Sequence, residues 1–120
     1  MTKVLSLRLP AALASTIRMH ASGMNRFPPA IVGSILEQSI GGPFSFSALP
    51  EVAQPLDGKL DVRLPAEFIA RLHAEAERLG TSISVYSRVI LYAFYAKRLV
   101  FVQIGGRYTL AENHDQKKSA

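Results

Sequence analysis

A seven-residue sequence occurs twice in this chain and places an arginine at the same position each time. The copies are residues 5–11 and 60–66, which lie 55 positions apart and share five residues, among them Arg8 and Arg63. In both copies apolar side chains alternate with other side chains, which is the period of a strand with one buried face. We therefore expect both arginines on the exposed face of a short strand, where a guanidinium can form bidentate hydrogen bonds.

The residues that share this exposed face differ between the copies. Val4 and Ser6 accompany Arg8 in the first strand, and Lys59 and Asp61 accompany Arg63 in the second. The intervening leucine and valine side chains are expected to face a core. Each strand ends at a proline, which starts the next element.

Charge is unevenly distributed along the chain. The net charge is +5, and residues 1–40 and residues 59–98 each contribute +3, whereas residues 41–58 contribute −2. Basic repeats around an acidic segment favour binding of a polyanion by the repeats. A basic protein without a polyanionic partner is the alternative that charge alone leaves open.

The order strand, helix, helix is predicted twice. Apolar side chains at helical spacing follow each proline, and we expect one unit at residues 1–40 and a second at 59–98. Three prolines and three glycines make 41–58 a linker. Two β-rich runs around Gly-Gly predict a hairpin at 99–111, and 112–120 are expected to be disordered.

Two stretches of the second unit resemble a known family. Val62-Arg63-Leu64-Pro65 and Tyr86-Ser87-Arg88-Val89 are similar to stretches of Arc-type repressors, in the ribbon-helix-helix family of DNA-binding proteins (Arc, MetJ and CopG types). The resemblance covers about 3–40 and 59–98, and two units in one chain are similar to TraY-type conjugation proteins. It implies a mainly α fold with a short two-stranded antiparallel β-ribbon. The two units would form a tandem ribbon-helix-helix, an intramolecular pseudo-dimer within one chain, and the C-terminal β-hairpin would follow them.

The family inserts its ribbon into the DNA major groove, so the resemblance implies that the exposed strand residues contact bases. Arginine suits the O6 and N7 atoms of guanine, valine a thymine methyl group, and aspartate the N4 donor of cytosine. The alternatives are surface salt bridges for the arginines, pairing of Asp61 with a neighbouring cation, and packing of Val4 within the ribbon. The predicted base contacts are Val4, Ser6, Arg8, Lys59, Asp61 and Arg63.

The family also holds a phosphate at the start of its second helix. Backbone N–H groups and the helix dipole favour an anion there. In the first unit Pro28 and Pro29 lack these N–H groups, which predicts a weaker grip unless Arg26 supplies the charge. The predicted phosphate contacts are Lys3, Arg26, Ser82 and Ser84.

The expected partner is double-stranded DNA, bound by a transcriptional regulator such as a repressor or by a plasmid-conjugation (relaxosome) accessory factor. The alternative is a protein-interaction module such as an antitoxin. The C-terminal hairpin is expected to mediate either self-association on DNA or the binding of a protein partner. We expect no enzyme, cofactor or metal, because His20, His73 and His114 have no acidic or cysteine partner at ligand spacing. Without cysteine or a long apolar run, we expect a cytoplasmic protein with no membrane role.

Overall fold

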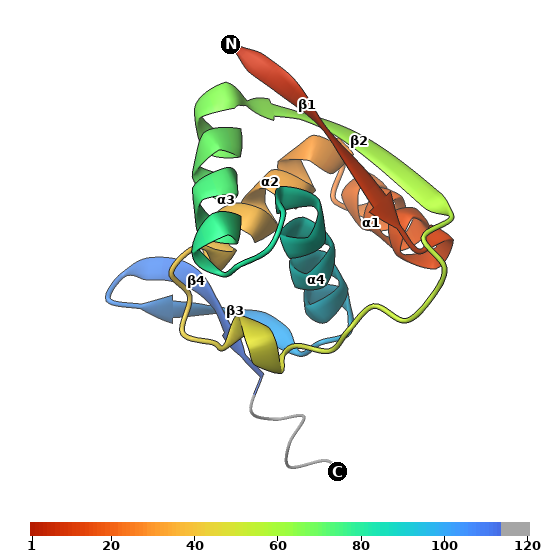
Figure 1. The fold of residues 1–120 in the computed structure, drawn as a ribbon. Coiled ribbons are helices and arrows are strands. Elements are labelled where there is room, and N and C mark those ends of the chain that lie inside the picture. The colour runs from red at the N-terminus through yellow and green to blue at the C-terminus, as the bar shows by residue number, and fades with distance from the viewer. Residues whose placement is uncertain (114–120) are drawn as a thin grey trace.

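The computed structural model describes residues 1–113. In this part of the chain two strand–helix–helix units precede a hairpin, and the ribbon and hairpin lie on opposite sides of the helices (Figure 1). The elements are β1 (Thr2–Leu9), α1 (Ala11–Gly23), α2 (Pro28–Ser39), a short 3-10 helix (Phe46–Ala48), β2 (Gly58–Pro65), α3 (Ala66–Arg78), α4 (Ile83–Tyr95), β3 (Leu99–Ile104) and β4 (Arg107–Glu112).

The predicted mainly α class is wrong. Residues 1–113 form an α+β fold with two separate two-stranded antiparallel sheets, β1–β2 and β3–β4, beside the four α-helices. Two features account for the difference. The first-sheet strands are eight residues long rather than short, and the C-terminal hairpin forms a full second sheet against α2 and α4.

The 55-residue spacing of the repeat continues through both helices of each unit. The first helices begin at Ala11 and Ala66, and the second helices begin at Pro28 and Ile83. Even the turns between them agree, because the left-handed position after the first helix is Asn25 in one unit (φ 55°) and Gly80 in the other (φ 74°). Asparagine and glycine tolerate that conformation best. The two units are therefore built alike without an insertion in either.

The two strands of the repeat pair with each other in antiparallel register. Ser6 lies opposite Asp61 at the middle of the ribbon, and the pairing extends from Thr2–Pro65 to Leu9–Gly58. Because Ser6 and Asp61 are also equivalent positions of the repeat, the two-fold axis that relates the units passes through this pair.

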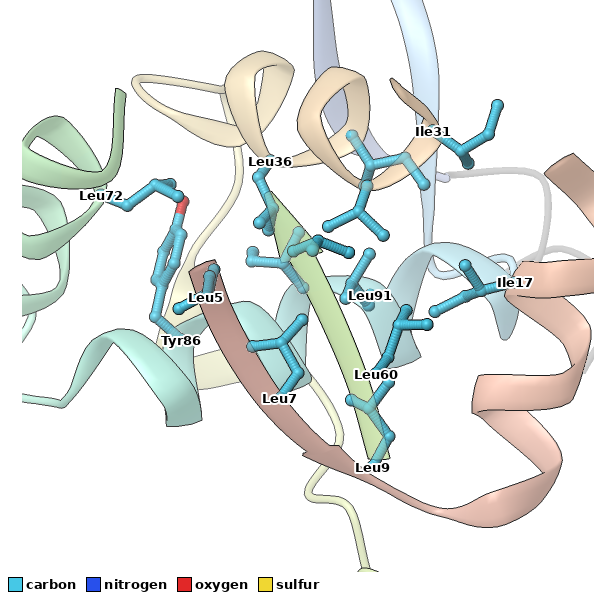
Figure 2. Close-up of a cluster of buried hydrophobic side chains, with 14 of the residues drawn as sticks. Leu5, Leu7, Leu9, Ile17, Ile31, Leu36, Leu60, Leu72, Tyr86 and Leu91 are labelled. Atoms are coloured by element: carbon cyan, nitrogen blue, oxygen red, sulfur yellow. The ribbon is translucent and has the colours of Figure 1, made fainter. Parts of the chain in front are cut away.

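The helices cover one face of the ribbon only. The inward leucines of the ribbon extend toward the helices, as Figure 2 shows for Leu5, Leu7 and Leu60. Each second helix packs against the strand of the other unit, α4 against β1 and α2 against β2. The units interlock as a result, and their buried side chains belong to one hydrophobic cluster.

A hydrogen-bonded hydroxyl pair lies inside this core. The Tyr86 hydroxyl is 2.5 Å from Ser39 Oγ, and Ser39 Oγ donates to the Leu36 carbonyl at 2.6 Å. Burial raises the pKa of Tyr86 to about 12, because the core disfavours a phenolate. This pair joins the end of α2 to the start of α4.

The hairpin is closed by a tight turn and attached at both ends. Gly105 and Gly106 have φ of 59° and 79°, which a two-residue type I′ turn requires. Thr109 Oγ1 donates to the Gln38 carbonyl of α2 at 3.2 Å.

The expected disorder from residue 112 is wrong at its start. The strand β4 includes Glu112, and the Asn113 N–H donates to the Arg98 carbonyl. Residues 114–120 lie outside the described residues.

No helix within residues 1–113 is long and apolar enough to cross a membrane.

The linker returns the chain to the ribbon and joins it to α1. Asp57 Oδ1 accepts a hydrogen bond from the Ala11 N–H, at the first position of α1, at 3.0 Å. Gly58 follows, and a Cβ atom there would lie 2.8 Å from the Ala11 Cα and 2.9 Å from the Leu9 carbonyl oxygen. A glycine is thus required where the linker meets the ribbon.

Gly58→Ala should destabilise the fold by about 1–3 kcal/mol, because backbone atoms cannot move aside as a side chain can. Gly23→Ala is the matched control, since a Cβ there meets nothing within 4 Å, and it should stabilise by about 0.4–1 kcal/mol. Urea unfolding of both variants measures the difference. Equal stability of the two variants would show that residue 58 has room for a methyl group beside the backbone of Leu9 and Ala11.

Candidate nucleic-acid interface

The outer ribbon face is the surface of β1–β2 turned away from the helices. Figure 1 shows the helices on one side of the ribbon, with nothing across the other. Eight exposed side chains make up this face, and six of them are the residues for which base contacts are predicted: Val4, Ser6, Arg8, Lys59, Asp61 and Arg63; the other two, Thr2 and Pro65, lie opposite each other at one end of the ribbon. Whether the six contact bases stays a prediction.

The register arranges these six side chains as three cross-strand pairs. The pairs are Val4 with Arg63, Ser6 with Asp61, and Arg8 with Lys59. The Ala66 N–H donates to the Met1 carbonyl at one end of the ribbon, so the outward pairs occupy the alternate positions that exchange no backbone hydrogen bonds. Side chains approach most closely at such positions.

One end of the outer ribbon face carries two cations opposite each other. Arg8 and Lys59 are exposed cross-strand neighbours, and like charges directly opposite are destabilising. Lys59 Nζ lies 3.8 Å from Asp61 Oδ2, which relieves part of the repulsion. Among residues 1–113, Arg8 and Arg63 form no ion pair. An anion bound at this end would offset the remaining repulsion between Arg8 and Lys59.

Two further arginines hold the edges of the ribbon. Arg88 Nη1 donates to the Arg8 carbonyl at 3.3 Å, and Arg18 Nη2 donates to the Lys59 carbonyl at 2.8 Å. Both carbonyls belong to the cation pair, so α4 and α1 fix the backbone beneath it from either side. Sequence reasoning missed both residues. Arg88 stands in a stretch that carries the family resemblance, whereas nothing local marks Arg18, whose partner is 41 positions away.

The predicted phosphate contacts lie apart from the outer ribbon face. Lys3 is exposed on the inner side of β1, beyond the core, and Arg26 is exposed in the turn before α2. Ser82 is the N-cap of α4, and its Oγ accepts from the Val85 N–H at 3.2 Å. Ser84 is at the second position of α4, where the helix leaves its own N–H and that of the preceding residue unpaired.

The equivalent helix start in the first unit lacks these donors. Pro28 and Pro29 occupy the first two positions of α2, so neither position has an N–H group. Phe27 stands where Ser82 stands in the other unit, and it forms no cap hydrogen bond and is 81% exposed. The two halves therefore differ in their capacity to hold an anion.

Metal ligation has no geometric support within the described residues. No group of three or more histidine, cysteine, aspartate or glutamate side chains is placed there to hold an ion. His20 Nδ1 is 2.7 Å from the Tyr95 hydroxyl, whose pKa is raised to about 12 by burial. His114 lies outside the described residues.

Comparison with protein-family models, curated proteins and solved structures found no match. The outer ribbon face is an uncovered two-stranded surface with three cations and one carboxylate, and arginines from the helices beneath it donate hydrogen bonds to its backbone at both edges.

Ser82→Ala should lower the free energy of unfolding by about 1 kcal/mol, because the Val85 N–H loses its cap. Phe27→Ala, at the equivalent position of the first unit, removes no cap bond and should change stability by about 0.5 kcal/mol or less. Chemical denaturation of the two variants compares them directly. A larger loss for Phe27→Ala would contradict the assigned cap.

Proposed function

We propose that the chain binds double-stranded DNA by placing its outer ribbon face in the major groove. One observation carries the proposal: a two-stranded antiparallel ribbon lies uncovered and exposes Arg8, Lys59 and Arg63. An eight-residue strand is about 26 Å long, and a two-stranded ribbon fits a groove about 12 Å wide. The resemblance to the ribbon-helix-helix family supports the same mode of binding.

The side chains of this face suit the edges of base pairs. A guanidinium matches the two acceptors of guanine, so Arg8 and Arg63 would each specify a G·C pair. Val4 would contact a thymine methyl group, and Ser6 can donate or accept. Asp61 would accept from cytosine N4, although its proximity to Lys59 also gives it a role in orienting that ammonium group.

Phosphate contacts would flank the ribbon. In the second unit Ser82, Ser84 and the free amides at the start of α4 offer neutral donors, while Lys3 and Arg26 add charge. Such contacts fix the position of a protein on the duplex without selecting its sequence.

The role would be that of a transcriptional regulator or a conjugative DNA-transfer accessory factor, working in the cytoplasm where its DNA is found. We propose neither catalysis nor a cofactor, since recognition by hydrogen bonding and charge accounts for the site. The operator or transfer-origin sequence would decide between the two roles.

The double variant Arg8→Ala, Arg63→Ala should lose about 2–6 kcal/mol of specific binding free energy, from about 1–3 kcal/mol for each bidentate contact. The control Arg98→Ala, Arg107→Ala removes the same charge from exposed positions near and at the hairpin. It should bind almost as well as the parent chain. Fluorescence anisotropy with a duplex selected from random sequence measures all three affinities.

A salt series separates base contacts from phosphate contacts. Each phosphate contact adds about −0.9 to the slope of log affinity against log salt concentration. If both double variants weaken binding equally, charge alone holds the DNA and the ribbon does not read it. If neither variant changes binding, the proposed interface is wrong.

The hairpin favours a second candidate function, the binding of another protein. Phe101, Ile104 and Tyr108 are 42%, 56% and 64% exposed, and β3 pairs with β4 alone within the described residues. An uncharged strand with a free edge can accept a further strand. An antitoxin-like module would keep its protein partner in the Arg8→Ala, Arg63→Ala variant, whereas a DNA-binding protein would lose its DNA.

A further inference from the structure

The outer ribbon face lacks the symmetry of the fold beneath it. The two-fold axis of the repeat passes through the Ser6–Asp61 pair, so equivalent residues of the two units lie at opposite ends of the ribbon. Two identical units would present the same side chains at both ends and would read a palindrome. Here the pair on the axis is itself unequal, since a hydroxyl faces a carboxylate.

The two ends differ in what stands opposite each arginine. Arg8 lies opposite Lys59, whereas Arg63 lies opposite Val4. Lys59 and Val4 are equivalent positions of the repeat, so the difference comes from one substitution between the units. We call these the Arg8–Lys59 end and the Arg63–Val4 end.

The two ends offer different chemistry to a base pair. The Arg8–Lys59 end brings two hydrogen-bond donors with positive charge to neighbouring positions, which matches the O6 and N7 acceptors of adjacent guanines. The Arg63–Val4 end brings one guanidinium and one apolar side chain. That combination matches a guanine next to a thymine methyl group.

The repulsion between Arg8 and Lys59 reinforces the preference. A guanine-rich edge supplies the electronegative atoms that this pair lacks, and the nearby Asp61 neutralises only one of its two charges. The arginine hydrogen bonds to both carbonyls of the pair hold its backbone in place. The Arg63–Val4 end has no cation pair that needs an acceptor-rich partner.

We infer that the chain binds an asymmetric duplex site in one orientation, with adjacent guanines under the Arg8–Lys59 end and a thymine-containing step under the Arg63–Val4 end. This inference rests on the proposed function. The correct orientation should be preferred by about tenfold or more, the size of one good base contact.

Tethered cleavage tests the orientation. The chain has no cysteine, so Ala12→Cys and Glu67→Cys each create a single attachment site for an iron chelate that cleaves DNA by hydroxyl radical. The two positions are exposed and equivalent in the repeat. Residue 12 follows the Arg8–Lys59 end and residue 67 follows the Arg63–Val4 end.

On a duplex selected by the parent chain, the Ala12→Cys conjugate should cut at the guanine-rich end and the Glu67→Cys conjugate at the other. Adding Val4→Lys with Lys59→Val keeps composition and net charge but moves the cation pair to the Arg63 end. In that background the two cleavage positions should exchange.

Tight binding with equal cleavage at both ends by each conjugate would overturn the inference and leave the proposed function standing. An unchanged cleavage pattern after the exchange of Val4 and Lys59 would also overturn it. If the parent chain selects no duplex at all, the proposed function fails and the orientation fails with it.

Discussion

The pairing of β1 with β2 within one chain is the constraint on which the rest of this structure depends. A single strand with two amphipathic helices leaves the backbone of the strand unpaired and the second helix apolar on too many sides. Antiparallel pairing supplies the hydrogen bonds and places six inward apolar side chains beneath the ribbon: Leu5, Leu7, Leu9, Leu60, Val62 and Leu64. Each second helix then covers the strand of the other unit, so neither unit completes its core alone.

The same pairing determines which side chains the ribbon exposes. A strand has two faces, and once the leucines occupy one, the other must carry the remaining side chains outward. A shift of register by one residue would turn the arginines into the core. The register also places Arg8 opposite Lys59, an arrangement that costs stability in the free protein. Local conflicts of this kind are expected at functional sites, which supports the proposed role of the outer ribbon face.

Much of this architecture could be predicted from residues with strong local preferences. The alternation around Arg8 and Arg63 located both strands and their exposed side chains, and the Gly105-Gly106 pair located the hairpin. Long-range contacts could not be found in this way. Nothing near Arg18 indicates that it reaches the Lys59 carbonyl, and nothing near Asn113 indicates that its N–H donates to the Arg98 carbonyl. The predicted fold class was wrong for a related reason. The length of a strand depends on its pairing with a partner strand, and the eight-residue strands of the ribbon add more β-structure than the mainly α class allows.

Nuclear magnetic resonance during titration with a selected duplex tests whether the outer ribbon face binds DNA. Binding through this face should change the chemical shifts along β1 and β2 and at the start of α4, with the largest changes at the Arg8 and Arg63 side chains. The tip of the hairpin, at Gly105 and Gly106, should remain unchanged. Changes confined to the hairpin, with the outer ribbon face unaffected, would show that the ribbon does not bind the duplex.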